Sequence, residues 1–459
     1  MNAVLPPTAT PPPPTFTSTS TQLPSQTPSP TATITLTLAP TATATLTPTA
    51  ALTASPQQIQ IFGELWNIVN DEYLYPDFNG LDWDAIYEEY RQRIESGLRD
   101  EDFYLSMDDM IYRLGDDHSV FLSPQEVFEE DAQFAGENDY VGVGILVSAV
   151  PERDRAVVLV TFPGSPAEQA GLKPRDNLLA ADGEPILDEE GNLRDIVRGP
   201  EGTAVELTIQ TPGEAVRQVF LTRARITGSV PVPSTVLTTP SGLRVGYLLL
   251  VTFSDASIDE EVGGILQEMS QAGPLDGLII DNRQNEGGAD DVLRGTLAYF
   301  TDGLMGNFVS RTEQHPLIVH GEDLNGSQTF PLVVLVGVNT VSFGEIFAGI
   351  LKDIGRAHVM GEVTDGNVET LWGYDFNDGS RAWIAHDTFQ PVNHPGEDWE
   401  ESGIVPDEIV LANWDEHALE TDPAIESALG YFEQEAQGLA DPSTSARNCL
   451  LIAEQIGVW

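Results

Sequence analysis

Ser342 stands where a short apolar strand is expected to turn into a helix, a place from which a serine hydroxyl can act as a nucleophile. Residues 331–336 read Pro-Leu-Val-Val-Leu-Val, and a helical pattern begins near Phe343. The unpaired N–H groups at a helix start can stabilise a negative charge that develops on a substrate oxygen. The same position also favours an ordinary helix-capping serine. The local sequence therefore leaves both roles open.

A second candidate segment ends in a pair of glycines. Residues 278–288 run from a buried strand into a polar turn that finishes at Gly287 and Gly288. Because glycine has no side chain, its backbone amide can approach a ligand closely. This turn can therefore supply a donor to an oxyanion, although it also fits a plain loop followed by a helix.

Two polar loops carry the remaining candidates. His118 follows two aspartates in the loop 115–119, and an imidazole with an ordinary pKa near 6.5 suits general-base work. Glu400 precedes a turn that reads Gly-Ile-Val-Pro-Asp at 403–407. Taken alone, the histidine fits a solvated residue and the acidic turn fits a surface loop.

Composition excludes several classes of protein. The 459 residues include 72 acidic and 21 basic ones, which gives a formal charge of −51. Such a chain repels phosphate backbones and anionic membrane surfaces, and no apolar run is long enough to span a bilayer. The single cysteine, Cys449, excludes an internal disulfide framework and a cysteine-based zinc site. A lysine base has only two candidates, Lys173 and Lys352.

Composition shifts along the chain predict five segments. Residues 4–56 contain no charged residue and consist almost wholly of Pro, Thr, Ser, Ala and Leu, which is typical of an extended tether. The expected segments are a disordered stalk at 1–56, a helical segment at 57–135, a β domain at 136–228, an α/β core at 229–415 and C-terminal helices at 416–459. The first residues show neither a basic nor an apolar signal region.

Hydrophobic periodicity predicts the elements of these segments. The β domain is expected to hold strands at 141–147, 156–161, 177–181 and 204–211. The core is expected to alternate strands at 245–250, 277–281, 332–336 and 358–361 with helices at 258–272, 289–299 and 343–354. Further helices are expected near 59–69, from 83, at 104–114, at 423–437 and at 443–456. Such alternation favours a sheet buried by crossover helices.

Taken in order, the motifs resemble those of the carboxyl-terminal processing, or tail-specific, serine protease family. The resemblance covers roughly 57–415 and rests on these stretches: Trp66 to Trp83, Leu114–Leu122, Gly142–Val147 with Gly164–Asp176, Asp281-x-Arg283-x-Asn285-x-Gly287-Gly288, and Glu345–Gly349 with Gly361-Glu362-x-Thr364. It implies an α/β core of the crotonase-like (ClpP-like) kind, an N-terminal helical segment and an inserted PDZ-like β domain.

The chain departs from the family at its usual base. Bacterial members pair the serine with a lysine about 25 residues further on, and counting from Ser342 reaches Asn367. The glutamine usual four residues later is Leu371. An asparagine is no base, Lys173 falls in the PDZ-like segment, and Lys352 falls on the helix after the serine. A serine–lysine dyad is therefore disfavoured.

A second branch, which resembles the tricorn core protease, uses a serine, a histidine and an acid instead. That resemblance implies Ser342 as nucleophile, His118 as base and Glu400 as the acid that orients it, with Glu401 and Glu369 as alternative acids. It also implies an oxyanion hole built from the amides of Gly287, Gly288 and Phe343. The chain order His–Ser–Glu argues against an α/β-hydrolase.

The resemblance implies a peptidase that binds protein tails. The segment Gly142, Val143, Gly144 and Ile145 is expected to bind an extended peptide by its C-terminal end. No metal or cofactor is called for, and the expected location is extracytoplasmic. The rival hypothesis is an inactive family member that binds peptides as a PDZ scaffold. A third is an unrelated hydrolase or acyl-transferring enzyme.

Overall fold

The computed structural model describes residues 53–116 and 118–438. The predicted stalk, apart from its last four residues, and the predicted helix at 443–456 lie outside them. All described residues belong to one unit of the chain, 51–459. Within the described residues, no helix combines the length and the apolar character that a membrane span requires.

The helical segment begins with three helices whose apolar faces pack together. They are α1 (Pro56–Glu72), α2 (Trp83–Glu95) and α3 (Asp100–Tyr112). Asp82 caps α2 as expected, because its side chain accepts a hydrogen bond from the Ala85 N–H at 3.0 Å. Helix α3 starts four residues before the predicted Tyr104, and its first turn carries three acidic residues that suit a helix N-terminus.

Two short elements follow these helices. Strand β1 (Val120–Leu122) leads into α4 (Pro124–Phe134), which the hydrophobic pattern did not predict. Ser123 and Glu126 form a capping box at its start. The 3-10 turn η1 (Phe78–Gly80) joins α1 to α2.

The β domain is built on the five-strand order β3-β4-β5-β7-β8, with β6 paired to β5 and β2 paired to β9. Its elements are β2 (Asn138–Gly142), β3 (Ile145–Val150), η2 (Pro151–Arg153), β4 (Arg155–Thr161), α5 (Pro166–Gln169), β5 (Asn177–Ala181), β6 (Glu184–Pro185), β7 (Ala204–Gln210), β8 (Arg217–Thr222) and β9 (Ala224–Gly228). The predicted single strand at 141–147 is wrong. The chain bends at Val143 and Gly144, where the glycine adopts a φ of +82°, and so forms β2 and β3.

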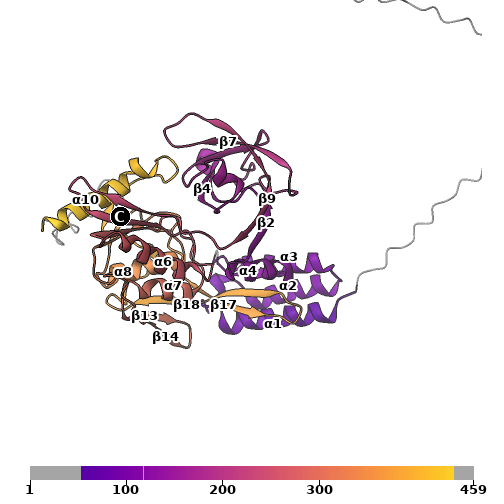
Figure 1. Ribbon diagram of the computed structural model, residues 1–459. Coiled ribbons are helices and arrows are strands. Elements are labelled where there is room, and N and C mark those ends of the chain that lie inside the picture. Colours follow the sequence, from indigo (N-terminus) through magenta and orange to yellow (C-terminus); the bar gives the residue numbers. More distant parts are fainter. Residues whose placement is uncertain (1–52, 117, 439–459) are drawn as a thin grey trace, which may run out of the picture. The chain divides into compact units, whose positions relative to one another are not determined.

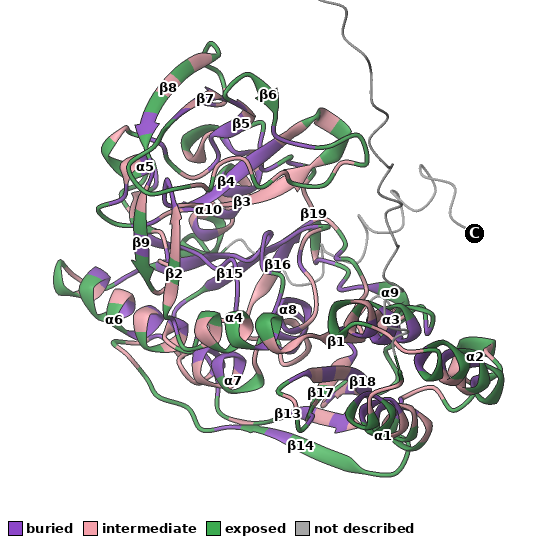
Figure 2. Cartoon of the chain, turned by 90° about the vertical axis from the view of Figure 1, so that its right-hand side faces the viewer, coloured by how far each residue is buried: buried purple, intermediate pink, exposed green. Residues whose placement is uncertain are grey.

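The core sheet has the order β10-β11-β12-β15-β16-β19, and its strands run parallel from β11 to β19. They are β10 (Ser234–Thr238), β11 (Arg244–Leu249), β12 (Gly277–Asp281), β15 (Leu332–Val336), β16 (His358–Gly361) and β19 (Glu408–Ile409). The helices are α6 (Ile258–Gln271), α7 (Asp290–Ala298), α8 (Phe343–Asp353) and α10 (Pro423–Ala436), with short turns α9 (Trp399–Ser402) and η3 (Leu419–Thr421). Every residue of β12 and β15 is buried, as expected of central parallel strands (Figure 2).

A second sheet, which the sequence did not predict, joins the core to the helical segment. It has the order β1-β18-β13-β14, with β17 paired to β18, and consists of β13 (Gly303–Val309), β14 (Gln314–Val319), β17 (Thr370–Asp375) and β18 (Arg381–Pro391) together with β1. One end of β18 pairs with β13, whereas the other pairs with β1 and β17 and lies near α1 (Figure 1). This strand therefore links the loop that holds His118 to the core.

Candidate active site

Ser342 lies in a strained turn between β15 and α8. Its backbone has φ +56° and ψ −128°, a region that residues other than glycine rarely adopt and that recurs at functional sites. Its N–H donates to the Asn367 carbonyl at 2.9 Å and lies 3.2 Å from Glu345 Oε2. These contacts hold the turn that places the serine at the helix start.

Glu345 fastens the serine turn to the neighbouring loop. This fully buried carboxylate also accepts hydrogen bonds from the N–H groups of Gly366 and Asn367, both at 2.9 Å, and from the Thr364 hydroxyl. Burial raises the pKa of Glu345, and these hydrogen bonds oppose that shift. The sequence analysis quoted Glu345 only as part of a motif. Its place three residues into a helix, after a serine, is the signal that predicts a capping role.

The glycine turn lies directly against the serine. A Cβ added to Gly287, whose φ is +86°, would stand 2.7 Å from Ser342 Cβ and 2.9 Å from the Phe343 nitrogen. The Gly287 N–H itself donates to Asn285 Oδ1 at 2.9 Å. By contrast, the N–H groups of Phe343 and Gly288 donate to no acceptor within residues 53–116 and 118–438. These two amides, rather than that of Gly287, are therefore available to an oxyanion.

Asparagines fix the glycine turn to α8. Asn285 Nδ2 donates to Asn282 Oδ1 at 2.9 Å, and Asn282 Nδ2 donates to the Gly344 carbonyl at 2.8 Å. The Thr340 hydroxyl donates to the Asn282 carbonyl at 2.9 Å. The sequence analysis did not single out Asn282 or Thr340, because an asparagine in a glycine-rich turn gives no signal of its partner.

The loop that carries His118 is held by Asp116. Its Oδ1 accepts hydrogen bonds from the N–H groups of His118 at 3.1 Å and Ser119 at 2.7 Å. The Ser119 hydroxyl donates to Asp116 Oδ2 at 2.7 Å and accepts the Ala385 N–H of β18 at 3.0 Å. Strand β18 thus anchors the histidine loop to the second sheet.

The His118 ring and the Ser342 backbone contact the same short segment. His118 Nδ1 lies 3.2 Å from the Glu369 carbonyl oxygen, two residues after Asn367, whose carbonyl accepts the Ser342 N–H. Two residues of extended chain span about 7 Å. A carbonyl only accepts, so Nδ1 is the donor in this contact. The contact fixes the orientation of the imidazole relative to the 367–369 segment.

The carboxylate that faces the histidine is Glu369. Its Oε2 lies 3.9 Å from His118 Nδ1, and its Oε1 accepts the Tyr75 hydroxyl at 2.6 Å. Glu400, the predicted acid, accepts the Val368 N–H at 2.6 Å with its Oε2. Glu401 is exposed on α9. The structure thus brings Glu369 and Glu400 to one place, and the sequence analysis did not foresee Tyr75.

The acids beside the histidine titrate unusually. Burial, opposed by the Tyr75 hydrogen bond and assisted by the charges of Glu400 and Asp116, raises the pKa of Glu369 to about 8. Burial also raises the pKa of Glu400. Like charges close together resist ionising at the same time. Perturbed carboxylates of this kind are typical of functional sites.

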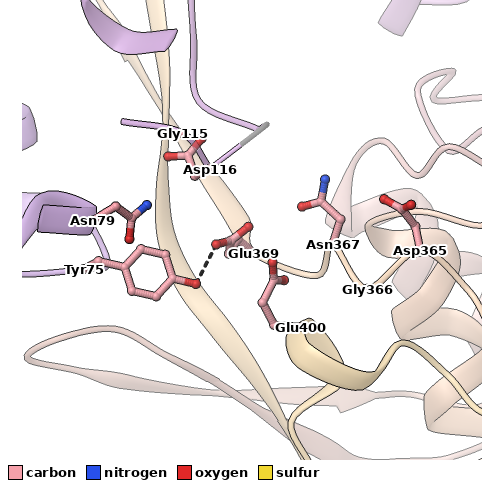
Figure 3. A pocket seen from close by; sticks show the side chains of 9 residues that line it. All are labelled: Tyr75, Asn79, Gly115, Asp116, Asp365, Gly366, Asn367, Glu369 and Glu400. Carbon is pink, nitrogen blue, oxygen red and sulfur yellow. Dashed lines mark hydrogen bonds between the residues drawn. The ribbon is translucent and has the colours of Figure 1, made fainter. Parts of the chain in front are cut away.

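A pocket of about 410 Å³ opens beside these groups (Figure 3). Its lining residues are almost all polar and come from the helical segment, the histidine loop, the 365–369 segment and α9: Tyr75, Asn79, Gly115, Asp116, Asp365, Gly366, Asn367, Glu369 and Glu400. In the described part of the chain, no three histidine, cysteine or acidic side chains are grouped as metal ligands.

The lysines lie elsewhere. Lys352 Nζ donates to the Val405 carbonyl at 2.7 Å and lies 4.0 Å from Asp407. Lys173 is an exposed residue of the β domain. Asn367, the residue reached by counting from Ser342, accepts the Ser342 N–H with its carbonyl at 2.9 Å.

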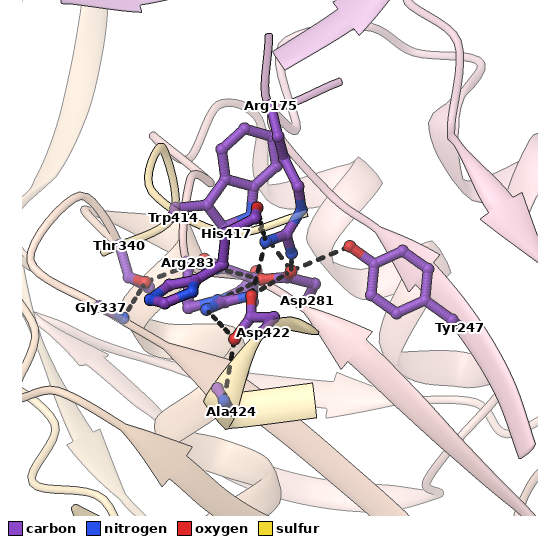
Figure 4. A network of polar contacts seen from close by, with 11 residues as sticks. Arg175, Tyr247, Asp281, Arg283, Gly337, Thr340, Trp414, His417, Asp422 and Ala424 are labelled. Carbon is purple, nitrogen blue, oxygen red and sulfur yellow. Dashed lines mark hydrogen bonds and ion pairs between the residues drawn. The ribbon is translucent and has the colours of Figure 1, made fainter. Parts of the chain in front are cut away.

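A buried network lies at the end of β12. Burial alone would raise the pKa of Asp281, but the charges of Arg283 and Arg175 outweigh it and lower that pKa to about 2. Asp422 accepts from both arginines, at 2.6 Å from Arg175 and 2.7 Å from Arg283 (Figure 4). The Asp-x-Arg part of the glycine-turn motif thus has a structural role, and the ion pairs of Arg175 connect the β domain to the core.

The predicted peptide-binding segment lies beside an open sheet edge. Strand β3, which begins at Ile145, is the edge strand of its sheet and pairs with β4 alone. The carbonyls of Val143 and Gly144 accept the N–H groups of Ala167 and Phe162. Their own N–H groups donate to no acceptor among the residues that the structure describes. The bend after Gly142 therefore presents backbone donors next to the edge.

Family models match three parts of the chain. Peptidase family S41 matches residues 244–410, the tricorn protease C1 domain matches 57–112, and the PDZ domain matches 158–211. The first match covers most of the core, the second lies in the helical segment and the third lies in the β domain. The PDZ match confirms the predicted character of the β domain.

Relatives with similar sequences carry the same description. A carboxyl-terminal-processing protease of Synechocystis sp. is 31% identical over 372 residues, which cover 79% of this chain and 83% of that protein. The protease of the same name from Picosynechococcus sp. is 32% identical and covers 83% of this chain and 91% of its own. The chloroplastic carboxyl-terminal-processing peptidase 2 of Arabidopsis thaliana is 28% identical, over 76% of this chain and 68% of its own.

A solved structure is similar as well. The photosystem II D1 C-terminal processing protease shares 26% identity and a TM-score of 0.55, over 82% of this chain and 98% of that one. The sequence and fold likenesses thus agree with the order of motifs around the serine, the glycine turn and the histidine. The chain belongs to the carboxyl-terminal-processing proteases of peptidase family S41.

Proposed function

We propose that this chain is a serine endopeptidase in which Ser342 is the nucleophile and His118 is the general base. The observation that carries the proposal is the shared 367–369 segment, whose carbonyls hold the Ser342 backbone and His118 Nδ1. A histidine is needed because Asn367 replaces the usual lysine and neither lysine of the chain lies in the pocket.

The reaction follows from this geometry. The Ser342 hydroxyl loses its proton to His118 Nε2 as Oγ attacks the peptide carbonyl, while Nδ1–H stays on the Glu369 carbonyl. The amides of Phe343 and Gly288 stabilise the oxyanion. The imidazolium then gives its proton to the leaving amine, and water hydrolyses the acyl-enzyme.

A carboxylate stabilises the imidazolium in this scheme. Glu369 faces Nδ1, and Glu400 holds the adjacent Val368 N–H, so we assign the first role to Glu369 in its ionised form and make Glu400 its partner. The positive charge of the imidazolium favours that form and opposes the burial that raises the pKa of Glu369 to about 8. This assignment replaces Glu400 with one of the alternatives that the sequence left open. Exposed Glu401 has no part in it.

The PDZ domain is proposed to bind substrate C-termini. An extended peptide can add a strand to the open edge of β3, and the N–H groups of Val143 and Gly144 can receive its carboxylate. We also propose the crotonase-like classification for the core and an extracytoplasmic location, as the family resemblance implies.

The second candidate is an inactive peptide-binding scaffold. The observation that favours it is Asn367, which removes the base used by many relatives. In both functions the PDZ domain binds a peptide along the open edge of β3, and only the peptidase cleaves it.

Cleavage of casein or an unstructured peptide by wild type and Ser342→Ala tests the proposal. We expect turnover by wild type and its loss in the variant, with the exposed Ser96→Ala as a matched control that keeps full activity. Equal turnover by Ser342→Ala would remove this serine from the mechanism. Binding of C-terminal peptides without any turnover, even at alkaline pH, would establish the scaffold instead.

A further inference from the structure

We infer that the acidic pocket beside Ser342 receives a positively charged substrate side chain, arginine or lysine, from a residue next to the scissile bond. The inference rests on the proposed function and names the substrate class for the same site. Four carboxylates line the pocket, from Asp116, Asp365, Glu369 and Glu400, and no arginine or lysine lines it (Figure 3).

The pocket holds more acid than catalysis requires. One carboxylate suffices to stabilise an imidazolium, and Glu369 faces the histidine. Asp116 is committed to its own loop, where both of its oxygens accept hydrogen bonds. Glu400 and the exposed Asp365 remain as surplus charges. Like charges gathered in one pocket repel one another, and a bound cation relieves that repulsion.

A second observation points to a missing donor. The Glu369 side chain is 3% exposed and lines the pocket. Its Oε2 lies 3.9 Å from His118 Nδ1 and its carboxyl adjoins that of Glu400, but no N–H group or hydroxyl among residues 53–116 and 118–438 donates a hydrogen bond to this oxygen. Asn367 Oδ1 is also buried without a partner in the described chain. Buried oxygens are costly to leave unpaired. An incoming guanidinium or ammonium carries only donors and can supply them.

The lining selects the class of cation. The described acids are not grouped tightly enough to ligate a metal ion, and 410 Å³ falls in the range of about 300–1,000 Å³ that organic ligands occupy. No aliphatic side chain lines the pocket, so an apolar substrate residue would desolvate charges without compensation. A guanidinium fits carboxylates in pairs and can also stack on an aromatic ring such as that of Tyr75.

The wall of the pocket adjoins the nucleophile. Asp365, Gly366 and Asn367 form one side, and the Asn367 carbonyl accepts the Ser342 N–H at 2.9 Å. A peptide whose carbonyl reaches Ser342 therefore has the side chains that flank the scissile bond near this wall.

The test uses peptides that differ in one charge. In an otherwise neutral peptide, arginine, its uncharged analogue citrulline, or glutamate is placed at each position that flanks the cleaved bond. Wild type, Asp365→Asn and Glu260→Gln are compared. Asp365 has no side-chain contact within the described part of the chain, and Glu260, an exposed acid on α6, likewise has none there. The two variants thus remove the same charge inside and outside the pocket.

We expect wild type to cleave the arginine peptide at least about tenfold faster, in kcat/KM, than the citrulline peptide, as a charge-assisted contact implies. Asp365→Asn should reduce this ratio and keep citrulline turnover, whereas Glu260→Gln should keep both. Ser342-dependent cleavage with equal rates for arginine and citrulline would overturn the inference and leave the proposed function standing.

A binding measurement covers the remaining case. If no Ser342-dependent cleavage is found, the proposed function fails, and calorimetry of the Ser342→Ala variant with N-acetyl-argininamide and N-acetyl-citrullinamide still tests the pocket. Binding of the arginine compound that weakens in Asp365→Asn supports a cation site. Binding that is absent or equal for both compounds overturns it.

Discussion

The two halves of the proposed active site differ in how completely their polar groups are paired. Around Ser342, the asparagines, Glu345 and the glycine turn satisfy one another within a buried cluster. Around His118, a half-buried loop meets crowded carboxylates, and Glu369 Oε2 and Asn367 Oδ1 have no donor in the described chain. Family motifs lie in both halves, in the serine and glycine turns and in Leu114–Leu122, whereas Asn367 lies where the two halves meet.

Under the proposed mechanism, this difference indicates where the chain departs from the relatives that use a lysine base. A pre-organised nucleophile and oxyanion site works with any base that reaches the hydroxyl. The base can therefore pass from a lysine to a histidine without rebuilding the serine turn, provided that a second element brings the histidine to the same segment. Strand β18 and the 367–369 segment do this here.

The largest expected effect comes from removing the base. His118→Gln keeps a donor for the Glu369 carbonyl but accepts no proton, so kcat/KM should fall by about 10³-fold or more. Lys352→Met is the control and should keep its activity, because Lys352 contacts Val405 and Asp407 instead. Peptide cleavage measures both. Full activity in His118→Gln would show that His118 is not the base and that the groups around it have only a structural role.

The next effect probes the serine half. In Gly287→Ala the new Cβ would stand 2.7 Å from Ser342 Cβ, at a φ of +86° that disfavours side chains. We expect about 10²-fold lower kcat/KM, as for loss of an oxyanion donor, and about 1–3 kcal/mol lower stability from overpacking.

Gly264→Ala on α6 is the matched control. Its Cβ meets nothing within 4 Å, so it should leave activity unchanged and slightly raise stability. Kinetics and urea unfolding measure both variants. If Gly287→Ala kept the wild-type kcat/KM and stability, the glycine turn would not pack against Ser342 as closely as described.

A smaller effect concerns the acid beside the histidine. The folded chain holds a proton on Glu369 up to about pH 8, whereas the unfolded chain releases it near 4.5. The stability of wild type should therefore fall as the pH rises through that window. Glu369→Gln lacks this proton, so its melting temperature should fall less between pH 5 and pH 9.

The control for that experiment is Glu401→Gln, which changes an exposed acid on the same side of the site. It should follow the wild-type pH dependence. Tyr75, His118, Asp116 and Glu400 also lie beside Glu369. A pH dependence in Glu369→Gln equal to that of wild type would mean that Glu369 ionises normally.

The smallest expected effect comes from Tyr75→Phe. The Tyr75 hydroxyl donates to Glu369 Oε1 at 2.6 Å and opposes the upward shift of that pKa. Its loss should raise the pKa of Glu369, move the acidic limb of the kcat/KM profile to higher pH and lower activity by a few-fold at pH 7, as for one hydrogen bond. Tyr112→Phe, an exposed tyrosine on α3, is the control. An unshifted pH profile of kcat/KM would show that the ionisation of Glu369 does not affect catalysis.

Much of the core was predictable because its strands are continuous apolar runs. The predicted strands at 277–281, 332–336 and 358–361 match β12, β15 and β16 at both ends. Local pattern suffices where each strand is buried on both faces.

The second sheet could not be predicted in the same way. Strand β18 pairs with β13, β17 and β1, which lie far apart in the sequence, and the first three residues of β14 are exposed. Such long-range pairing leaves no local periodicity. The bend at Val143 and Gly144 was missed because Val141, Val143, Ile145 and Val147 alternate as in one continuous strand.

The site was predictable to the extent that motifs carry it. The motifs gave Ser342, His118, Gly288 and Phe343 as candidates, whose roles stay predictions, and counting from the serine reached Asn367, whose carbonyl accepts the Ser342 N–H. The choice of Glu369 over Glu400 needed three-dimensional contacts, because it depends on which carboxylate meets Nδ1. Tyr75 was missed because a tyrosine in the link between two helices gives no chemical signal.

The most direct test is covalent labelling of the nucleophile, which needs no knowledge of the substrate. Wild type is incubated with a fluorophosphonate, and peptide mass spectrometry locates the label. The account predicts one adduct on Ser342, formed at least about 10²-fold more slowly in His118→Gln and at the wild-type rate in Lys352→Met. An equal labelling rate in His118→Gln, or loss of labelling in Lys352→Met, would contradict it.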